Sequence, residues 1–452
     1  MKASVVIASC LLLVVVAGLF AQSGDRPVTF ALTGDSLITQ KISVFDEPEF
    51  TKLIEGIRAA DVAFTNLEML FHDYEAYPST ESGGTYMRAD PAILKDILWA
   101  GFDMVALANN HAVDYGVEGL RINLRHVRES GIVHAGVGED LSLARAPGYL
   151  DSRIGRVALI SCSSTYPSFG MAGPARPPVR GRPGLSPLRF TTLYKLDAAG
   201  MNALKALMAE LPGARRNPEA KTITFLGSRF ELADKTEIVT APNEQDLKEL
   251  TAVIRGARKQ ADWVVVSVHC HESFPGNREK PPQFLETFAH AAMDAGADIL
   301  TATGPHILKG VEIYHGKPIF YSLGNFIFQN ETLDFFPEEN YRQYGLGPEA
   351  TPGDFNEVRF KNDTTSYPAD DKNWVSVVAY PQFRSGKLER IDLWPIVLGQ
   401  KKPRSQRGRP VLADGAAADQ ILQHLSELSA PYGTKISIQN GRGTIVAADA
   451  PK

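Results

Sequence analysis

The residues best suited to chemistry in this chain follow short apolar segments. The segment "VVVSVHCHESF" (264–274) begins like a strand buried on both faces and then turns polar from His269 to Glu272. Burial of apolar surface stabilises such a strand, whereas clustered polar groups at its end oppose burial. These side chains are therefore either solvated by a loop or arranged around a cation that takes nitrogen and oxygen ligands.

Several other apolar segments also end in potential ligands. Those ligands are Asp35, Asn66, Glu68, Asn109, Asn110, His111, His306 and Asn325. In α/β sheets the carboxyl ends of parallel strands share one edge, and ligands bind in the crevice there. The alternative is that each polar residue only begins a loop. This alternative can account for any single residue but not well for the whole set. The set therefore predicts a metal site at one sheet edge.

Alternating apolar patterns define the elements that must position these residues. Strands are predicted at 28–35, 61–68, 103–111, 157–164, 262–272, 298–306 and 319–326. Between several of them, apolar residues recur at spacings of three and four, which is typical of helices, and Gly follows several of these segments. Strand–helix alternation predicts an α/β fold in which helices cover a sheet.

Composition limits the classes of partner. The chain has 452 residues, a formal net charge of −5 and an isoelectric point near 6.1. Nucleic-acid binding needs a concentrated basic face, so no nucleic-acid partner is expected. The length fits one large domain with extensions or two to three smaller domains.

The amino terminus predicts export. Lys2 precedes an apolar run from Ala3 to Ala21 with small residues near its end, the pattern of a signal peptide cut near Ala21 or Gln22. An uncleaved membrane anchor is the alternative, because the run approaches bilayer-spanning length. The expected location is periplasmic, extracellular or anchored at the outer face. One disulfide between the two later cysteines is conceivable.

Two irregular segments interrupt the pattern. Residues 166–190 are rich in Pro, Gly and Arg, and residues 329–373 form a second insertion that is acidic and aromatic by turns. Arg180 and Arg182, together with Arg176 and Arg189, are predicted to contact an anionic substrate, because guanidinium groups match carboxylate and phosphate geometry. A solubilising surface loop is the alternative.

Five motifs together resemble a known family. They are "TGDSL", "TNLE", "LANNHAVDYG", "VHCHE" and "PHILKGVEIYHGKPIFYSLGNFIF". They are similar to the CapA-type proteins of poly-γ-glutamate capsule synthesis, within the calcineurin-like metallophosphoesterase superfold. The resemblance implies a four-layer αββα sandwich. Together with the amino-terminal pattern, it divides the chain into a leader or anchor (1–26), the main domain (27–330), and an insertion with closing elements of the same domain (331–452).

The resemblance also implies roles for particular residues. Metal ligands would be Asp35, Glu68 as the bridging carboxylate, Asn110, His269 and His306. His111 would act beside the substrate, with Asp114 either orienting it or capping the next helix. Glu272 and Asn325 would lie near the substrate. Such ligands suit one or two divalent ions, namely Mn, Zn or Fe.

Structural alternatives exist for several of these residues. Asp35 could cap a helix near "SLITQK", and His111 could start a helix. Asn66 and Asn109 could be turn residues whose side chains bond their own backbone.

One motif departs from the family pattern. Family members usually read His-Pro-His where this chain has Gly304, Pro305 and His306. The loss of one imidazole predicts fewer than two tightly bound ions, and Gly304→His is expected to raise metal occupancy. His271 could replace the missing ligand, because residues two apart on a strand point to the same side.

The resemblance leaves the activity open between classes. The first reading is a metal-dependent hydrolase of phosphoester or amide bonds acting on an anionic polymer such as poly-γ-glutamate. The second is a polymer-binding or assembly protein with a degenerate metal site, and the third is a cell-wall hydrolase unrelated to capsule. Membrane-bound synthase subunits are the partners that the resemblance implies.

Overall fold

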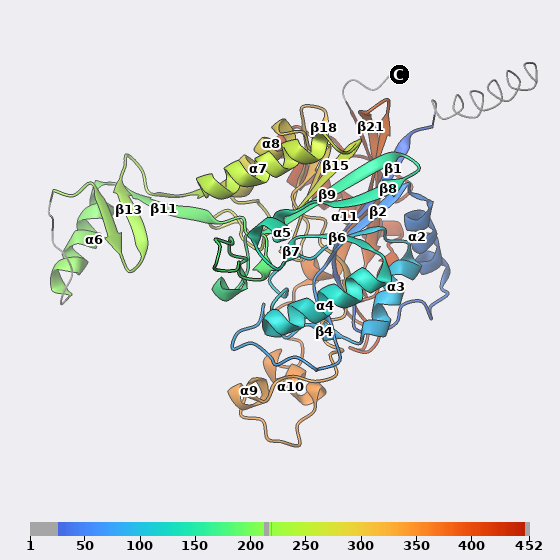
Figure 1. Ribbon diagram of the computed structural model, residues 1–452, viewed down its shortest axis with the longest axis horizontal. Coiled ribbons are helices and arrows are strands. Elements are labelled where there is room, and N and C mark those ends of the chain that lie inside the picture. Colours follow the sequence, from blue (N-terminus) through green and yellow to red (C-terminus); the bar gives the residue numbers. More distant parts are fainter. Residues whose placement is uncertain (1–25, 212–216, 218, 448–452) are drawn as a thin grey trace, which may run out of the picture.

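The structure is a computed structural model that describes residues 26–211, 217 and 219–447 (Figure 1). The expected leader or anchor lies outside the described residues. Among the described residues, no helix is both long and apolar enough to cross a membrane. Cys162 and Cys270 are both buried free thiols, so the disulfide considered between them is not formed.

A ten-stranded sheet carries the first half of the site. Its strands are β1 (Val28–Leu37), β2 (Val62–Leu67), β5 (Met104–Ala106), β6 (Val133–Ala135), β19 (Asn325–Phe328), β20 (Val375–Arg384), β21 (Lys387–Val397), β22 (Val411–Leu412), β23 (Ser437–Gln439) and β24 (Arg442–Val446). β1, β2, β5 and β6 are parallel neighbours in that order. The residues after these strands therefore meet at one edge.

A six-stranded sheet carries the second half. Its strands are β8 (Gly148–Ser152), β9 (Gly155–Ser163), β15 (Trp263–His269), β16 (Ile299–Thr303), β17 (Val311–Tyr314) and β18 (Lys317–Phe320). β9, β15, β16 and β18 run parallel. Two short sheets pair β3 (Leu70–Phe71) with β4 (Arg88–Ala89) and β7 (Val137–Gly138) with β10 (Gly184–Leu185).

The outer face of the ten-stranded sheet is covered by α2 (Pro48–Ala59), α3 (Leu94–Ala100) and α4 (Gly116–Ser130), and that of the six-stranded sheet by α7 (Glu244–Arg258) and α8 (Gln283–Asp294). The other helices are α5 (Leu141–Arg145), α6 (Ala198–Glu210), α9 (Glu338–Gln343), α10 (Pro352–Arg359) and α11 (Gly415–Ser429). In α4 the buried Leu120, Leu124 and Val127 share one face, and Gly131 ends the helix with a φ of 80°. The helical spacing and the terminal glycine thus behave here as the sequence predicts.

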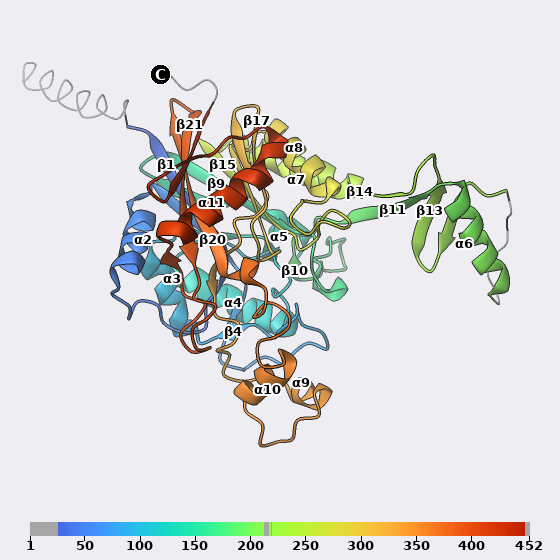
Figure 2. The ribbon, with the colours of Figure 1, turned by 180° about the vertical axis from the view of Figure 1, so that it is seen from behind.

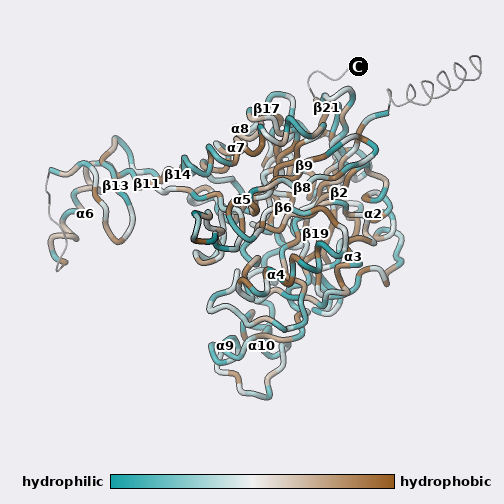
Figure 3. Tube along the Cα trace, viewed as in Figure 1, coloured by the Kyte–Doolittle hydropathy of each residue, from teal (hydrophilic) through white to brown (hydrophobic). Residues whose placement is uncertain are grey.

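Three hydrophobic layers hold the sandwich together. Alternate residues of β1 point to opposite faces, so Phe30 and Leu32 join the core between the sheets while Ala31 joins the core under α2, α3 and α4. β15 does the same, since Val265 faces the other sheet and Val264 faces α7 and α8. Figure 3 shows the strands as the most hydrophobic part of the trace. The predicted four-layer α/β architecture is confirmed.

The carboxyl-terminal residues complete the ten-stranded sheet. β20 runs antiparallel to β1 and pairs with β21, while α11 packs its apolar face into the core between the two sheets. The second irregular segment, by contrast, forms a lobe that contains α9 and α10 and projects from the body, while several of its apolar residues join the core under α2, α3 and α4 (Figure 1). Its aromatic residues Phe336, Phe355 and Tyr341 pack on one another.

Residues 190–242 form an arm that the sequence analysis did not predict. β11 (Phe190–Leu196) and β14 (Glu237–Pro242) leave the body as an antiparallel pair, and β12 (Thr222–Phe225) and β13 (Ser228–Leu232) extend the same sheet. α6 covers this sheet through Met201 and Met208. Figures 1 and 2 both show the arm projecting from the sandwich.

A glycine pair allows β1 and the start of β19 to approach closely at the site. A Cβ atom on Gly34 would lie 1.7 Å from the Gly324 carbonyl oxygen. The Asp35 amide donates a hydrogen bond of 3.0 Å to that same oxygen. Gly34 therefore fixes the spacing between the strands that carry Asp35 and Asn325.

Gly34→Ala should destabilise the protein by about 3 kcal/mol, because the new methyl group meets backbone that cannot rotate away. Thermal and denaturant unfolding measure the change. Gly256→Ala is the matched control, because Gly256 lies inside α7 and a Cβ atom added there would meet open space. The free energy of unfolding of that variant should rise by about 0.5–1 kcal/mol. Equal stability of Gly34→Ala and the wild type would contradict the close approach.

Candidate metal centre

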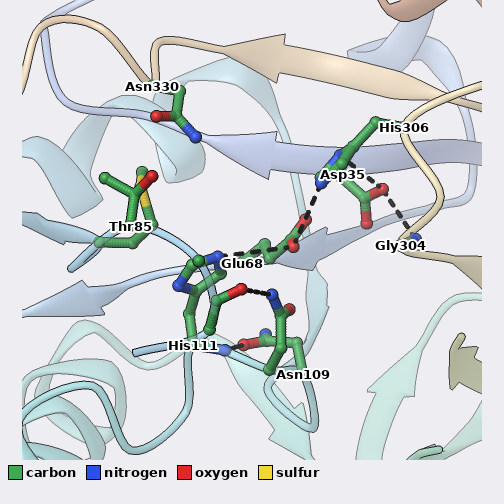
Figure 4. Close-up of polar contacts among 12 residues, drawn as sticks. Asp35, Glu68, Thr85, Asn109, His111, Gly304, His306 and Asn330 are labelled. Atoms are coloured by element: carbon green, nitrogen blue, oxygen red, sulfur yellow. Dashed lines mark hydrogen bonds and ion pairs between the residues drawn. The ribbon is translucent and has the colours of Figure 1, made fainter. Parts of the chain in front are cut away.

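The predicted polar residues converge where the two sheets meet. Asp35 lies near the end of β1, Glu68 follows β2, and Asn110 follows β5. His269 ends β15, and His306 lies beyond β16. Figure 4 shows Asp35 and His306 on one side of Glu68, with His111 on another. The parallel topology of both sheets thus gathers ligand-type side chains from distant segments.

Glu68 is the centre of this cluster. It is fully buried, and neither of its carboxylate oxygens has a hydrogen-bond partner among the described residues. Burial and the neighbouring Asp35 carboxylate raise the pKa of Glu68 to about 8. A buried carboxylate without donors is costly unless a cation accompanies it. This environment fits a bound metal ion.

Four imidazole nitrogens face one oxygen of Glu68. The Nε2 atoms of His269, His271, His306 and His111 lie 3.6, 3.7, 3.7 and 3.9 Å from its Oε1. Two sets of three residues have ligand atoms within 4.8 Å of one another: Glu68, His271 and His306, and Asp35, Glu68 and His269. Carboxylate and imidazole donors of this kind suit Mn, Zn or Fe.

Two histidines are held so that Nε2 points at Glu68. His306 Nδ1 donates to the Asn325 side-chain oxygen at 2.8 Å, and the Asn325 amide donates to the Asn373 carbonyl at 3.0 Å. His111 Nδ1 donates to Asp114 Oδ2 at 2.7 Å. Partners of this kind fix the tautomer and ring orientation of a metal-site histidine. Asn325 and Asp114 are thus positioning residues, and Asp114 orients His111 instead of capping the next helix.

His269 and Asn110 lie against each other. The Asn110 amide donates to the Gly83 carbonyl at 2.7 Å, which turns its oxygen toward His269 Nε2, also 2.7 Å away. Thr303 Oγ1 lies 3.1 Å from the opposite ring nitrogen of His269. The Asn110 oxygen and His269 Nε2 are therefore placed to contact the same ion.

Asp35 is held by groups from both sheets. The Asn66 amide donates to one oxygen at 2.8 Å, and the Gly304 amide donates to the other at 2.8 Å. β1 continues as a strand to Leu37, so Asp35 caps no helix. Asn66 lies within β2 and is no turn residue. Both of those structural alternatives are wrong.

The residues around His111 form a tight turn. The His111 amide donates to the Asn109 side-chain oxygen at 3.1 Å, which confirms Asn109 as a turn residue. His111 precedes α4, which begins at Gly116, so it starts no helix. Burial alone would lower the pKa of His111, but Asp114, Glu68 and the Thr85 carbonyl together raise it.

His271 occupies the space that a side chain at position 304 would need. A Cβ atom on Gly304 would lie 2.9 Å from His271 Cδ2 and 3.1 Å from His269 Cε1, and Gly304 has a φ of 109°. His271 thus brings an imidazole to the region from which the Gly304 substitution removes one. The prediction that Gly304→His raises metal occupancy does not fit this geometry.

A hydrogen-bonded loop places His271. Its amide donates to Thr165 Oγ1 at 2.9 Å, and the buried Lys309 ammonium donates to the Glu272 carbonyl at 2.9 Å. The Glu272 carboxylate accepts from Ser164 and Thr165 at 2.7 and 2.9 Å. Glu272 therefore supports the loop, and its substrate role stays a prediction.

Some arginines of the segment 166–190 form contacts within the protein. Arg189 was expected to contact an anionic substrate. Its guanidinium instead forms an ion pair with the buried Asp246 at 2.7 Å. Arg180 and Arg182 are exposed, and Arg182 Nε donates to the Met171 carbonyl at 2.8 Å. Within the described part of the chain, neither contacts the Glu68 cluster. Their substrate role also stays a prediction.

The sequence analysis missed several supporting residues. They are Thr85, Ser164, Thr165, Thr303, Lys309, Asn330 and Asn373. Thr303 had a usable signal, because it ends β16 beside the end of β15. Asn373 lies in a short 3-10 helix, and the others lie in loops whose paths no strand or helix pattern determines.

Comparison with known proteins agrees with this architecture. The family described as "Bacterial capsule synthesis protein PGA_cap" matches residues 29–330. The chain belongs to this CapA-type family. An uncharacterized protein of Sinorhizobium fredii, y4sH, is 34% identical over 92% of each chain.

Two named relatives are more distant. The Bacillus anthracis "Capsule biosynthesis protein CapA" is 26% identical over 67% of this chain and 60% of its own length. The "PGA biosynthesis protein CapA" of Bacillus subtilis is 25% identical over 75% of this chain and 77% of its own length. The predicted family is therefore confirmed.

His271→Ala should lower the number of tightly bound divalent ions per chain, because it removes one of the imidazoles that face Glu68. Gly304→His alone should also lower it, since two rings would compete for one space. The double variant His271→Ala with Gly304→His should recover part of the loss. Elemental analysis after dialysis and calorimetric titration with Mn²⁺ or Zn²⁺ measure these effects.

The matched control is His315→Ala, because His315 is exposed on the turn between β17 and β18. Its metal content should equal that of the wild type. If His271→Ala also retained full metal content, another residue would complete the site.

Proposed function

We propose that this protein is an exported metal-dependent hydrolase that acts on an anionic polymer, with poly-γ-glutamate as the first candidate and a phosphoester as the second. The buried Glu68 carboxylate carries the proposal, because it has no hydrogen-bond donor among the described residues and faces four imidazoles. The polymer follows from the names of the Bacillus relatives, which refer to capsule and PGA biosynthesis.

The donor set fits one or two divalent ions. Asp35, Glu68, Asn110, His269, His271 and His306 would hold them. Such ions would polarise the carbonyl or phosphoryl oxygen of the bond that is cleaved and would lower the pKa of a bound water. Asn66 and the Gly304 amide orient Asp35, while Asn325 directs His306 toward Glu68.

His111 is the residue proposed to act on the substrate. Its Nδ1 is held by Asp114, and its Nε2 faces Glu68 at 3.9 Å. A charged imidazole in this position would donate a proton to the leaving oxygen or nitrogen, or stabilise its developing charge. Asp114 also accepts from the Gly83 and Met87 amides at 2.8 Å each, so the His111–Asp114 pair is fixed to the chain.

His111→Ala removes the proposed proton donor and should reduce metal-dependent turnover by about 10²-fold or more, the usual range for losing acid–base assistance. Asp35→Asn removes a charged metal ligand and should reduce the same turnover by about as much, because the bound ion would be weakened or lost. Turnover is measured on bis(p-nitrophenyl) phosphate and on poly-γ-glutamate, the latter by chain length. Only activity that requires added divalent metal is counted. Circular dichroism checks that the variants remain folded.

His126→Ala is the control, because His126 lies on α4, pairs with Glu129 of its own helix at 3.8 Å and is not one of the imidazoles that face Glu68. It should retain wild-type turnover. Retained turnover in both Asp35→Asn and His111→Ala would place the active site elsewhere. Metal binding without hydrolysis of either substrate would instead favour a polymer-binding protein.

Export is part of the same proposal. Lys2 and the apolar run to Ala21 support it, and an extracellular polymer requires it. Cell fractionation with amino-terminal sequencing should recover the protein outside the cytoplasm, either cut near Ala21 or Gln22 or held at the membrane. Recovery of a soluble cytoplasmic protein that begins at Met1 would contradict export.

A further inference from the structure

A second group of polar side chains borders the metal centre without contributing a predicted ligand. Asn330 follows β19 and is only 8% exposed. Its oxygen accepts from the Tyr367 hydroxyl at 3.2 Å, which leaves the amide nitrogen as a donor. Figure 4 shows Asn330 on the same side of Glu68 as Thr85, with its amide nitrogen directed toward the carboxylates. Within the described residues, that nitrogen has no hydrogen-bond acceptor.

Arg359 reaches the same side from the lobe that contains α10. Its guanidinium donates to Thr85 Oγ1 at 2.8 Å and to the Gly84 carbonyl at 3.1 Å. Thr85 is 3% exposed, and its backbone carbonyl interacts with His111. Only one residue therefore separates the Arg359 charge from the imidazole proposed to act on the substrate.

Arg359 differs from other arginines in this part of the molecule. Arg407 pairs with Glu331 and Asp363, and Arg342 pairs with Glu338. Arg359 has neutral oxygen acceptors only and makes no ion pair with any described residue. A guanidinium offers five N–H donors, so several remain for an additional partner. Its charge is therefore left for a group that the described residues do not supply.

A chain of ring contacts connects the lobe to the opposite side of the centre. The ring of Phe328 lies 5.4 Å from His306 and 5.0 Å from Tyr367. Tyr367 packs on Phe360 at 4.7 Å, and the Arg359 guanidinium lies 4.9 Å from the Phe360 ring. This aromatic packing fixes Arg359 and Asn330 relative to His306. The two donors are thus held by the core of the lobe.

We propose that Asn330, Arg359 and the Thr85 hydroxyl form a subsite for an anionic oxygen group of the substrate, either a carboxylate or a phosphate, beside the metal centre. This deepens the proposed function and rests on it for the place of the subsite. Charge-assisted hydrogen bonds from a guanidinium recognise both groups in the same geometry. The subsite would hold the anionic group next to the bond that is cleaved, and the second irregular segment would contribute specificity.

The test is calorimetric titration of the full mature chain with two probes, inorganic phosphate and tri-γ-glutamate. Arg359→Gln and Asn330→Asp should each weaken binding of at least one probe by about tenfold, because the first removes a charge-assisted donor and the second places a negative charge against the anion. The matched control is Arg342→Gln on α9, whose side chain is 76% exposed and pairs with Glu338. It should bind both probes like the wild type.

The outcomes distinguish a phosphate from a carboxylate ligand, and they test the anion subsite separately from the metal-dependent hydrolase. Weaker binding of phosphate alone indicates a phosphoester substrate, and weaker binding of tri-γ-glutamate alone indicates a carboxylate polymer. Each titration is repeated on metal-free protein, and the metal content of every variant is measured. Loss of anion binding in Arg359→Gln without metal supports the subsite even if the metal-dependent activity fails. Wild-type affinity of both variants for both probes, at unchanged metal content, would overturn the subsite.

Discussion

The buried carboxylate of Glu68 is the constraint on which the rest of the site depends. Removal of a charged group from water is expensive, and this carboxylate receives no hydrogen bond from the described residues. Burial and Asp35 raise its pKa to about 8, so without a cation it would be protonated near neutral pH. The imidazoles that face Glu68 are suited to bind the same cation. Asn325 and Asp114 hold the Nδ1 atoms of His306 and His111, which keeps the Nε2 atoms directed toward Glu68.

The fold supplies this arrangement because the parallel strands of the two sheets end at the same place. Asp35, Glu68 and Asn110 come from one sheet, whereas His269 and His306 come from the other, so the core between the sheets sets the distance across the site. Gly34 allows the backbone near Gly324 to approach within hydrogen-bonding distance of Asp35. The ligand geometry is therefore a consequence of sheet packing, and a change in that packing would alter both stability and metal affinity.

Sequence patterns predicted the strands, the helices over a sheet and the convergence of ligand-type residues, because apolar periodicity and strand ends are local signals. The four-layer sandwich was implied by the family resemblance. The sequence patterns could not predict the arm at 190–242, whose short strands and small core give a weak pattern. Nor could they assign Asn66 or Asn325, since an amide serves as ligand, turn former or support depending on what lies opposite. Asn66 faces Asp35, and Asn325 faces His306, only because distant strands become neighbours.

His271 and Gly304 show how a loop can place an imidazole beside Glu68 where position 304 carries no side chain. A ligand is defined by where its donor atom lies, and the chain can deliver that atom from another strand end if the space is empty. Gly304 leaves the space, and Thr165 and Lys309 hold the loop that fills it with His271. Because His271 is 31% exposed while Glu68 is fully buried, this imidazole lies on the open side of the centre. In the proposed hydrolase, His271 would therefore be both a metal ligand and part of the surface that meets the substrate.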